Sequence, residues 1–327
     1  MKRREFITLI SGAAATWPVA VRAQNPSKRQ IVGVLVGGSQ ASSTRYRGGF
    51  DKGLEELGHV DGRDIEFVYR YADGDTARLP GFAEELAQLG CSIIVSGTES
   101  GAIAAKNAAP NTPIVATVMS DPVGFGLAAS QSRPGGTVTG ILNTVDSLPG
   151  KQVEIALETI PGTKQIGLIL NMTNPISALY QRSVDATIQG LGVQLIRFEV
   201  HSPDELDGVF TELARQHVSI ALMHQDLMFL SQRSRIAALG LSSRVPTMFS
   251  FREHVEEGGL ISYGVDLRES WHRAANYVHK ILKGALPGEL PIEFPTKLEL
   301  VINIKTAKAL DVTISPYLLS RADEVIE

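Results

Sequence analysis

The chain has 327 residues, of which 43% are hydrophobic and 20% are charged, and its formal net charge is −4. This length and composition suit two ordinary hydrophobic cores, so we expect two lobes rather than one. The charge is spread without a basic block, which argues against nucleic acid as a partner. The seven histidines are scattered and the one cysteine, Cys91, has no Cys-x-x-Cys partner. We therefore expect no metal site and no cofactor.

Residues 1–23 are typical of a cleaved export signal, with a basic start, a mildly apolar middle and a small-x-small end at Val21-Arg22-Ala23. The pair Arg3-Arg4 favours the twin-arginine route, with the general secretory route as the alternative. Cys91 lies far from the leader, so it is no lipid-anchor cysteine. No later apolar run reaches the ~18 residues of a membrane span. We expect a soluble, monomeric periplasmic protein.

From Ile31 onward, short β-branched runs alternate with longer helical patterns, which is typical of a parallel sheet covered by helices. Strands are predicted at 31–36, 65–69, 92–95, 113–118 and 138–142, and helices near 46–57 and 79–89. A helix is also predicted at 271–283 and a strand at 298–303. On the helix at 271–283 we interpret Trp271, His272 and Tyr277 as core and surface residues.

The second half of the chain repeats the first. Ile166–Leu170 and Gly190–Gly192 stand at one constant offset from Val32–Val36 and Glu56–Gly58. Glu212–Ala221 likewise echoes Glu85–Ile94. The sequence therefore predicts two copies of one doubly wound α/β lobe.

Paired lobes place a ligand in the cleft between them, because ligands of open α/β sheets bind beyond the carboxyl ends of the strands. Crossings between the lobes are predicted at 138–149 and 249–264. The expected first lobe comprises residues 30–145 and about 265–295. The expected second lobe comprises 146–262 and about 298–327.

Several segments resemble the ABC-transporter substrate-binding protein family related to tryptophan- and tyrosine-binding receptors. They are the leader, Ile31–Leu35, Gly53–Asp64, Ser120–Gly126, Arg133–Gly136, Gly258–Gly264, Pro295–Leu310 and Arg321–Ile326. The resemblance covers nearly the whole mature chain. It implies a type I periplasmic-binding-protein fold, closure about a hinge, and a membrane permease as partner. It does not imply one ligand, although it favours an amino acid.

Candidate ligand contacts in the first lobe follow its strands. Ser96, Thr98 and Ser100 lie where a strand passes into a helix, so we expect a hydroxyl-lined seat for a ligand carboxylate, with helix capping as the alternative role. Ser39 follows the first strand in the same way. Asp121 follows the fourth, where it either receives a ligand ammonium or caps a turn.

The second lobe supplies matching candidates. Asn171 and Asn174 follow its first strand, and Asp226 follows Ile220–Met223, where a buried carboxylate is suited to an α-ammonium. Phe249 and Tyr263 are expected on a crossing segment, either stacked on the ligand or packed in the hinge. Arg45, Tyr46 and Arg47 are expected either to contact a ligand carboxylate or, more commonly for such residues, to lie on a solvated helix face.

The most consistent function is a periplasmic solute-binding protein of an ABC uptake system that binds a small carboxylate-bearing ligand, such as an aromatic or branched amino acid, without transforming it. A ligand-sensing module for a signalling partner stays open. An exported hydrolase is disfavoured because neither a Gly-x-Ser-x-Gly nor a phosphate-binding motif fits Gly97–Gly101.

Overall fold

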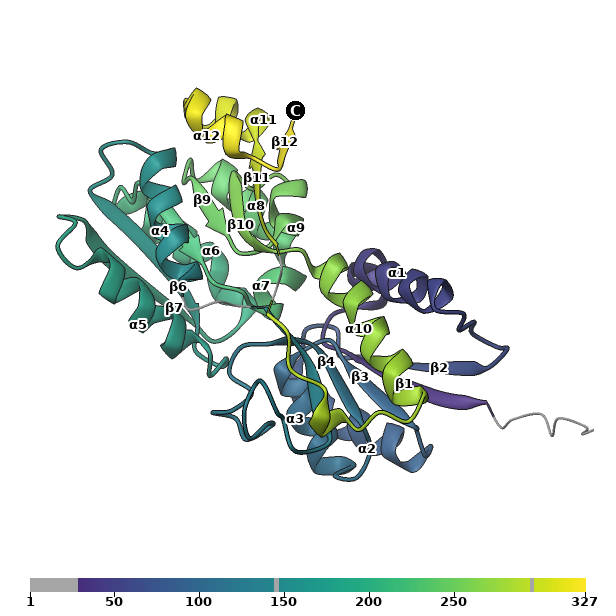
Figure 1. Ribbon diagram of the computed structural model, residues 1–327. Coiled ribbons are helices and arrows are strands. Elements are labelled where there is room, and N and C mark those ends of the chain that lie inside the picture. The colour runs from purple at the N-terminus through teal and green to yellow at the C-terminus, as the bar shows by residue number, and fades with distance from the viewer. Residues whose placement is uncertain (1–28, 144–146, 295–296) are drawn as a thin grey trace, which may run out of the picture.

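The computed structural model describes residues 29–143, 147–294 and 297–327. These residues form two α/β lobes, each built on its own sheet (Figure 1). The export signal predicted at 1–23 lies outside the described residues, and the crossing predicted at 138–149 is described only in part.

The sheet of the first lobe has five parallel strands in the order β2-β1-β3-β4-β5. They are β1 (Gln30–Val36), β2 (Ile65–Tyr71), β3 (Ile93–Ser96), β4 (Ile114–Met119) and β5 (Val138–Leu142). Strands β1 and β3 read as continuous apolar runs because helices cover both faces of the sheet.

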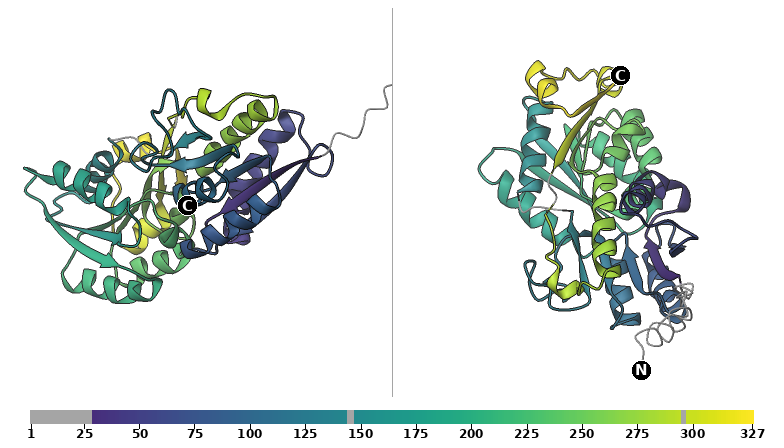
Figure 2. Two further views of the ribbon diagram at one scale, coloured as in Figure 1. Left: turned by 90° about the horizontal axis from the view of Figure 1, so that it is seen from below. Right: turned by 45° about the vertical axis from the view of Figure 1, so that its right-hand side comes forward.

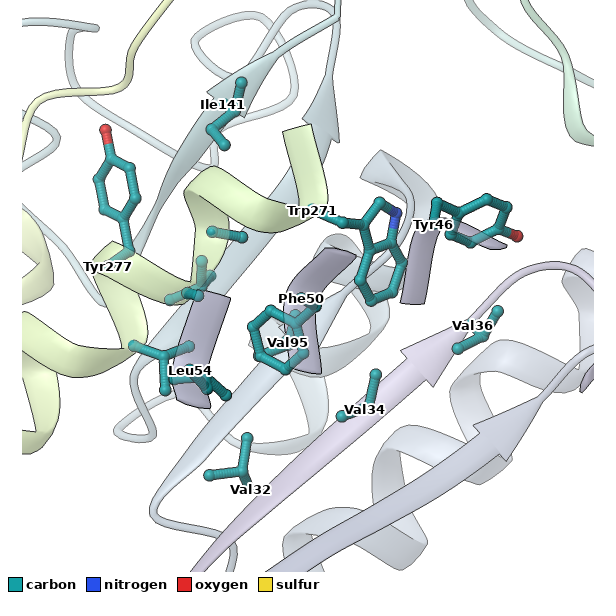
Figure 3. Close-up of a cluster of buried hydrophobic side chains, with 14 of the residues drawn as sticks. Val32, Val34, Val36, Tyr46, Phe50, Leu54, Val95, Ile141, Trp271 and Tyr277 are labelled. Atoms are coloured by element: carbon teal, nitrogen blue, oxygen red, sulfur yellow. The ribbon is translucent and has the colours of Figure 1, made fainter. Parts of the chain in front are cut away.

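Four α-helices cover this sheet: α1 (Gln40–Glu56), α2 (Leu79–Gln88), α3 (Glu99–Ala108) and, from late in the chain, α10 (Leu267–Leu282). Alternate residues of β1 divide the core. Val34 packs in one cluster with Phe50 and Trp271 from α1 and α10, as Figure 3 shows. Leu35 packs on the opposite face with Leu86 of α2.

The second sheet has the order β12-β11-β10-β9-β8-β6-β7. Its strands are β6 (Gln165–Asn171), β7 (Gln194–Val200), β8 (Ile220–Met223), β9 (Thr247–Phe249), β10 (Ile261–Val265), β11 (Leu298–Asn303) and β12 (Glu324–Ile326). The run β7-β6-β8-β9-β10 repeats the order of the first sheet, which confirms the internal repeat read from the sequence. Only the β10–β11 pairing is antiparallel among the described strands.

The helices around the second sheet are α4 (Leu148–Thr159), α5 (Ser177–Ile188), α6 (Leu206–Arg215), α7 (Leu227–Ser231), α8 (Arg233–Ser242), α9 (Arg252–Glu256), α11 (Ile304–Ala309) and α12 (Pro316–Arg321). Short 3-10 turns are η1 (Thr76–Arg78), η2 (Pro203–Glu205) and η3 (Pro287–Glu289). The C-terminal elements lie at the end of the second lobe that is remote from the first sheet (Figure 2). Among the described residues, no helix combines the length and apolarity that crossing a bilayer requires.

The crossing expected at 249–264 is wrong in position. Those residues form β9, α9 and β10 within the second sheet, and the chain leaves that lobe between Val265 and Leu267. Helix α10 then packs against α1, and Glu293 pairs with Ile141 at the edge of the first sheet. The chain returns to the second sheet at β11. The aromatic and glycine content of 249–264 serves strand packing rather than a hinge.

Gly140 lies at a point in the first sheet where there is no room for a side chain. Its φ is +145°, and a Cβ at this position would lie 1.9 Å from the carbonyl oxygen of Ala116 on β4. Gly136 is exposed, and a Cβ there would meet no atom within 4 Å.

We predict that Gly140→Ala lowers the free energy of unfolding by about 2–4 kcal/mol, because it combines backbone strain with a clash. The control Gly136→Ala should change it by less than about 1 kcal/mol. Urea unfolding followed by circular dichroism measures both. Equal stabilities of the two variants would contradict this role of Gly140.

A buried group of charges lies beside the crossing. Arg252 on α9 is 7% exposed and pairs with Glu256, Glu299 and Glu324. The neighbouring Glu253 is also 7% exposed, and within the described residues neither of its carboxylate oxygens has a hydrogen-bond partner. Burial raises the pKa of Glu253 to about 7, and nearby carboxylates add to the effect.

The raised pKa of Glu253 predicts a stability that depends on pH. The folded protein holds this proton between pH 4.5 and 7 whereas the unfolded chain releases it, so the contribution to stability is lost as the pH rises through 7. Glu253→Gln should therefore raise the free energy of unfolding at pH 8 by about 1–3 kcal/mol and change it little at pH 5. Denaturation at the two pH values tests this, and a stabilisation equal at both would contradict it.

Candidate functional site

The candidate site lies where the two strand orders reverse. In the first sheet the reversal falls between β1 and β3, and in the second between β6 and β8. Gly37 and Gly97 follow the first pair of strands, and Asn174 and Asp226 follow the second pair. All four residues line one cavity with an empty volume of about 820 Å³, part of it open to solvent. Ligands of doubly wound sheets bind at such reversal points, so both lobes contribute to this cavity.

Most of the cavity wall is apolar. Its apolar lining residues are Val36, Tyr46, Ile103, Val118, Phe125, Pro175, Ile176, Leu227, Leu230, Phe251, Leu267 and Trp271. The rings of Tyr46 and Trp271 lie 5.4 Å apart between their centroids. Figure 3 shows both rings above the carboxyl end of β1. Leu230 and Phe251 belong to the second lobe but share a buried cluster with these rings. The cavity is thus suited to a flat apolar group.

The hydroxyls predicted as a carboxylate seat have local partners. The Ser96 hydroxyl donates to the carbonyl of Thr98 at 2.7 Å, and the Thr98 hydroxyl accepts from the Gly101 amide at 2.9 Å. Thr98 therefore caps α3, and it lines the cavity together with the exposed Ser100, while Ser96 does not. Within the described residues the backbone amides of Glu99 and Ser100 have no acceptor, so an anion could bind there.

Glu99 is a buried carboxylate on the first-lobe wall. It is 9% exposed, and its Oε1 accepts the amides of Ser120 and Asp121 at 3.2 and 3.0 Å. Its Oε2 has no partner among the described residues. Burial raises the pKa of Glu99 to about 7 against the opposing effect of the two amides, and Asp121 raises it further.

Asp226 faces the same cavity from the second lobe and is 6% exposed. Its Oδ2 accepts the side-chain amides of Asn171 and Asn174 at 3.0 and 2.8 Å, and its Oδ1 accepts the backbone amide of Phe229 at 3.1 Å. Asn171 itself lies behind the cavity wall. Three donors thus hold this carboxylate and leave it little capacity for a further strong bond.

Besides Ser96 and Asn171, four more predicted contacts lie outside the cavity lining. Ser39 caps α1 in a reciprocal pair with Ser42. Asp121 accepts the Gly124 amide and borders an adjoining pocket. Phe249 is fully buried and stacked on His254, and Tyr263 packs against the core of the second lobe. A contact from any of these residues to a ligand stays a prediction.

Sequence reasoning passed over Glu99 and Gln225 and did not select Tyr46 or Trp271 as site residues, although all four line the cavity. In the sequence Glu99 looks like an ordinary acidic residue in the first turn of a helix. Its position in the turn after β3 was the sequence signal that could have identified it as a cavity residue. Tyr46 was expected on a solvated face but is 5% exposed. Trp271 was interpreted as a core residue. It is buried in the core, and it also lines the cavity.

The lobes touch at the mouth of the cavity. Arg45 on α1 forms an ion pair with Glu256 on α9. A Cβ on Gly37 would lie 2.4 Å from Leu227 Cδ1 of the other lobe. The lobes are therefore in contact beside the cavity, which lies between them and is partly open to solvent.

Known proteins resemble this chain over most of its length. It is 25% identical over 285 residues to the tyrosine-binding protein of Clostridioides difficile strain R20291, a match covering 87% of this chain and 81% of that protein. A solved ABC domain in complex with L-Trp, from Streptococcus pneumonia, is 25% identical and has a TM-score of 0.85, with 91% of this chain and 100% of that chain covered. The ligand-free, open structure of a substrate binding protein with adhesive properties from Clostridium difficile is 22% identical and has a TM-score of 0.68, with 91% and 99% covered.

The similarity also extends to a whole protein family. Residues 31–326, which span both lobes, match the family model described as ABC transporter substrate binding protein, and the chain therefore belongs to that family.

Proposed function

We propose that this protein is the periplasmic receptor of an ABC uptake transporter and that it binds an amino acid with an aromatic side chain between its lobes. The closed lobes then present the ligand to a membrane permease. Binding and release are the whole of its action, and the ligand leaves unchanged.

The cavity at the facing reversal points is the observation that carries this proposal. It lies at the strand ends where ligands of doubly wound sheets bind, and residues of both lobes line it. One part of its wall is made of rings and aliphatic chains, with Tyr46 and Trp271 among them. Another part holds carboxylates, amides and hydroxyls. An amphipathic ligand with a flat apolar end and a charged end matches both parts.

The arrangement of the lobes also supports this proposal. With nearly equal coverage, the chain superimposes better on the L-Trp complex than on the open, ligand-free relative. Hinge closure on a ligand is a common motion of two-lobed binding proteins. The contacts of Arg45 and Gly37 with the second lobe belong to the closed arrangement.

A serine and histidine pair lies near the cavity without the geometry of a nucleophile. Ser177 Oγ is 3.0 Å from His224 Nε2, but Ser177 also donates to the Asn171 carbonyl. Both side chains are 2% exposed and neither lines the cavity. Within the described residues His224 Nδ1 has no partner that would orient the ring. This pair therefore supports packing rather than hydrolysis.

We predict that L-tryptophan, L-tyrosine or L-phenylalanine raises the melting temperature of the purified protein. A ligand at a hundred times its Kd adds about 2.7 kcal/mol of stability, which corresponds to about 5 °C or more in a protein of this size. Differential scanning fluorimetry measures the shift. Hexoses and pentoses serve as controls, because a neutral sugar leaves the charged groups of the cavity without a partner. A shift with a sugar and none with any amino acid would refute the proposed ligand class.

Closure itself is tested at Gly37, where a side chain would enter the contact between the lobes. Gly37→Val should weaken amino-acid binding at least about tenfold, because Leu227 then cannot approach and binding must oppose the displacement. Gly48→Val is the matched control, since a Cβ on Gly48 meets no atom within 4 Å. Calorimetry measures the affinities, and small-angle scattering should show a larger radius of gyration for Gly37→Val with ligand. Unchanged affinity and radius would show that the lobes do not close here.

A further inference from the structure

The charged side chains among the described lining residues of the cavity are acidic. Among its described lining residues, Glu99 and Asp226 are acidic and none is a lysine, arginine or histidine. The two acids come from different lobes and line the same cavity. Such a lining attracts a positively charged group and repels a ligand that carries a negative charge without a positive one.

The two acids differ in what already binds them. Asp226 accepts three hydrogen bonds from Asn171, Asn174 and Phe229. Glu99 accepts two backbone amides on Oε1 alone, and its buried Oε2 has no partner within the described residues. A buried carboxylate oxygen without a donor is costly. Glu99 Oε2 is therefore the acceptor that a ligand would satisfy.

A second unsatisfied acceptor lines the same cavity and belongs to the second lobe. Gln225 is 9% exposed and lines the cavity, and its Oε1 has no donor among the described residues. An ammonium group carries three donors and no acceptor, so it is suited to a site with two free acceptors from opposite lobes.

We propose that Glu99 binds the ammonium group of the ligand. The cavity then selects its ligands by that ammonium group rather than by the carboxylate. This inference rests on the function proposed above and narrows it. Aromatic amines without a carboxylate should then bind, and aromatic acids without an ammonium should not. The predicted carboxylate seat becomes secondary, with the backbone amides of Glu99 and Ser100 and the Ser100 hydroxyl as its remaining donors.

Proton linkage should accompany this contact. The titratable groups around Glu99 are Asp121 after β4, Asp226 after β8 and Tyr46 on α1, whose pKa burial raises far enough to keep it neutral. With the lobes in this arrangement and no ligand between them, Glu99 has a pKa of about 7 and is partly protonated at neutral pH. An ammonium binds the ionised form, so the affinity should rise with pH from 5 to 7, by up to about tenfold for each unit, and level off above.

The test is calorimetric titration of the unsubstituted protein and of Glu99→Gln with three ligands that share one ring system. L-tryptophan carries both charges, tryptamine only the ammonium, and indole-3-propionate only the carboxylate. Glu99→Gln keeps an acceptor for the amides of Ser120 and Asp121 and removes the charge. Glu84→Gln, on the exposed face of α2, removes the same charge away from the cavity.

The unsubstituted protein and Glu84→Gln should bind tryptophan and tryptamine but not indole-3-propionate. Glu99→Gln should bind the first two about 30-fold or more weakly and should lose the rise in affinity between pH 5 and 7. Tryptophan binding that is equal in Glu99→Gln and the unsubstituted protein, or unaffected by pH in that range, overturns the role of Glu99 and leaves the proposed function intact. No binding of any aromatic amino acid to the unsubstituted protein overturns both. The pH series on the unsubstituted protein decides the matter even if Glu99→Gln fails to fold.

Discussion

A charge removed from water needs a partner, and this protein buries carboxylates on both walls of one cavity. Asp226 has its partners within its own lobe. One oxygen of Glu99 accepts two backbone amides from the segment that follows β4, and its other oxygen has no partner within the described residues. The rest of the architecture places Glu99 in this buried position. Two sheets of the same strand order bring their reversal points together, and closure of the lobes removes the solvent that would otherwise hydrate the acid.

Under the proposed function, the duplicated fold makes ligand binding and closure one event. Each lobe alone would leave its reversal point open to water, and a solvated carboxylate has little preference for an ammonium over water. When Leu227 and Leu230 approach the first lobe, the local dielectric falls and each polar contact in the cavity becomes stronger. The apolar wall around Tyr46 and Trp271 supplies affinity for a ring, whereas the acidic wall supplies discrimination by charge.

The fold was largely predictable from the sequence because its signals are local. Strands such as Ile31–Val36 are buried on both faces and therefore apolar throughout, and the repeat at Ile166–Leu170 identifies the second lobe. The position of the cavity was predictable too, because the strand-end rule depends only on the order of elements. The crossing placed at 249–264 was wrong because glycine and aromatic residues suit a buried strand pair as well as a hinge.

The chemistry of individual residues was less predictable, because it depends on contacts between distant segments. Ser96 and Thr98 have the residue types of a ligand seat, yet their hydroxyls bond to the turn in which they lie. Glu99 looked like an ordinary acid in a first helical turn, and only the approach of the chain after β4 shows where its carboxylate points. Trp271 reaches the cavity because α10 returns from the second lobe.

The most direct test of this account is a crystal structure of the protein grown with L-tryptophan. The account predicts the indole ring beside Trp271 and Tyr46, with the ligand nitrogen within hydrogen-bonding distance of Glu99 Oε2. Ligand density outside the interlobe cavity, or a ligand carboxylate in place of the nitrogen at Glu99, would contradict it.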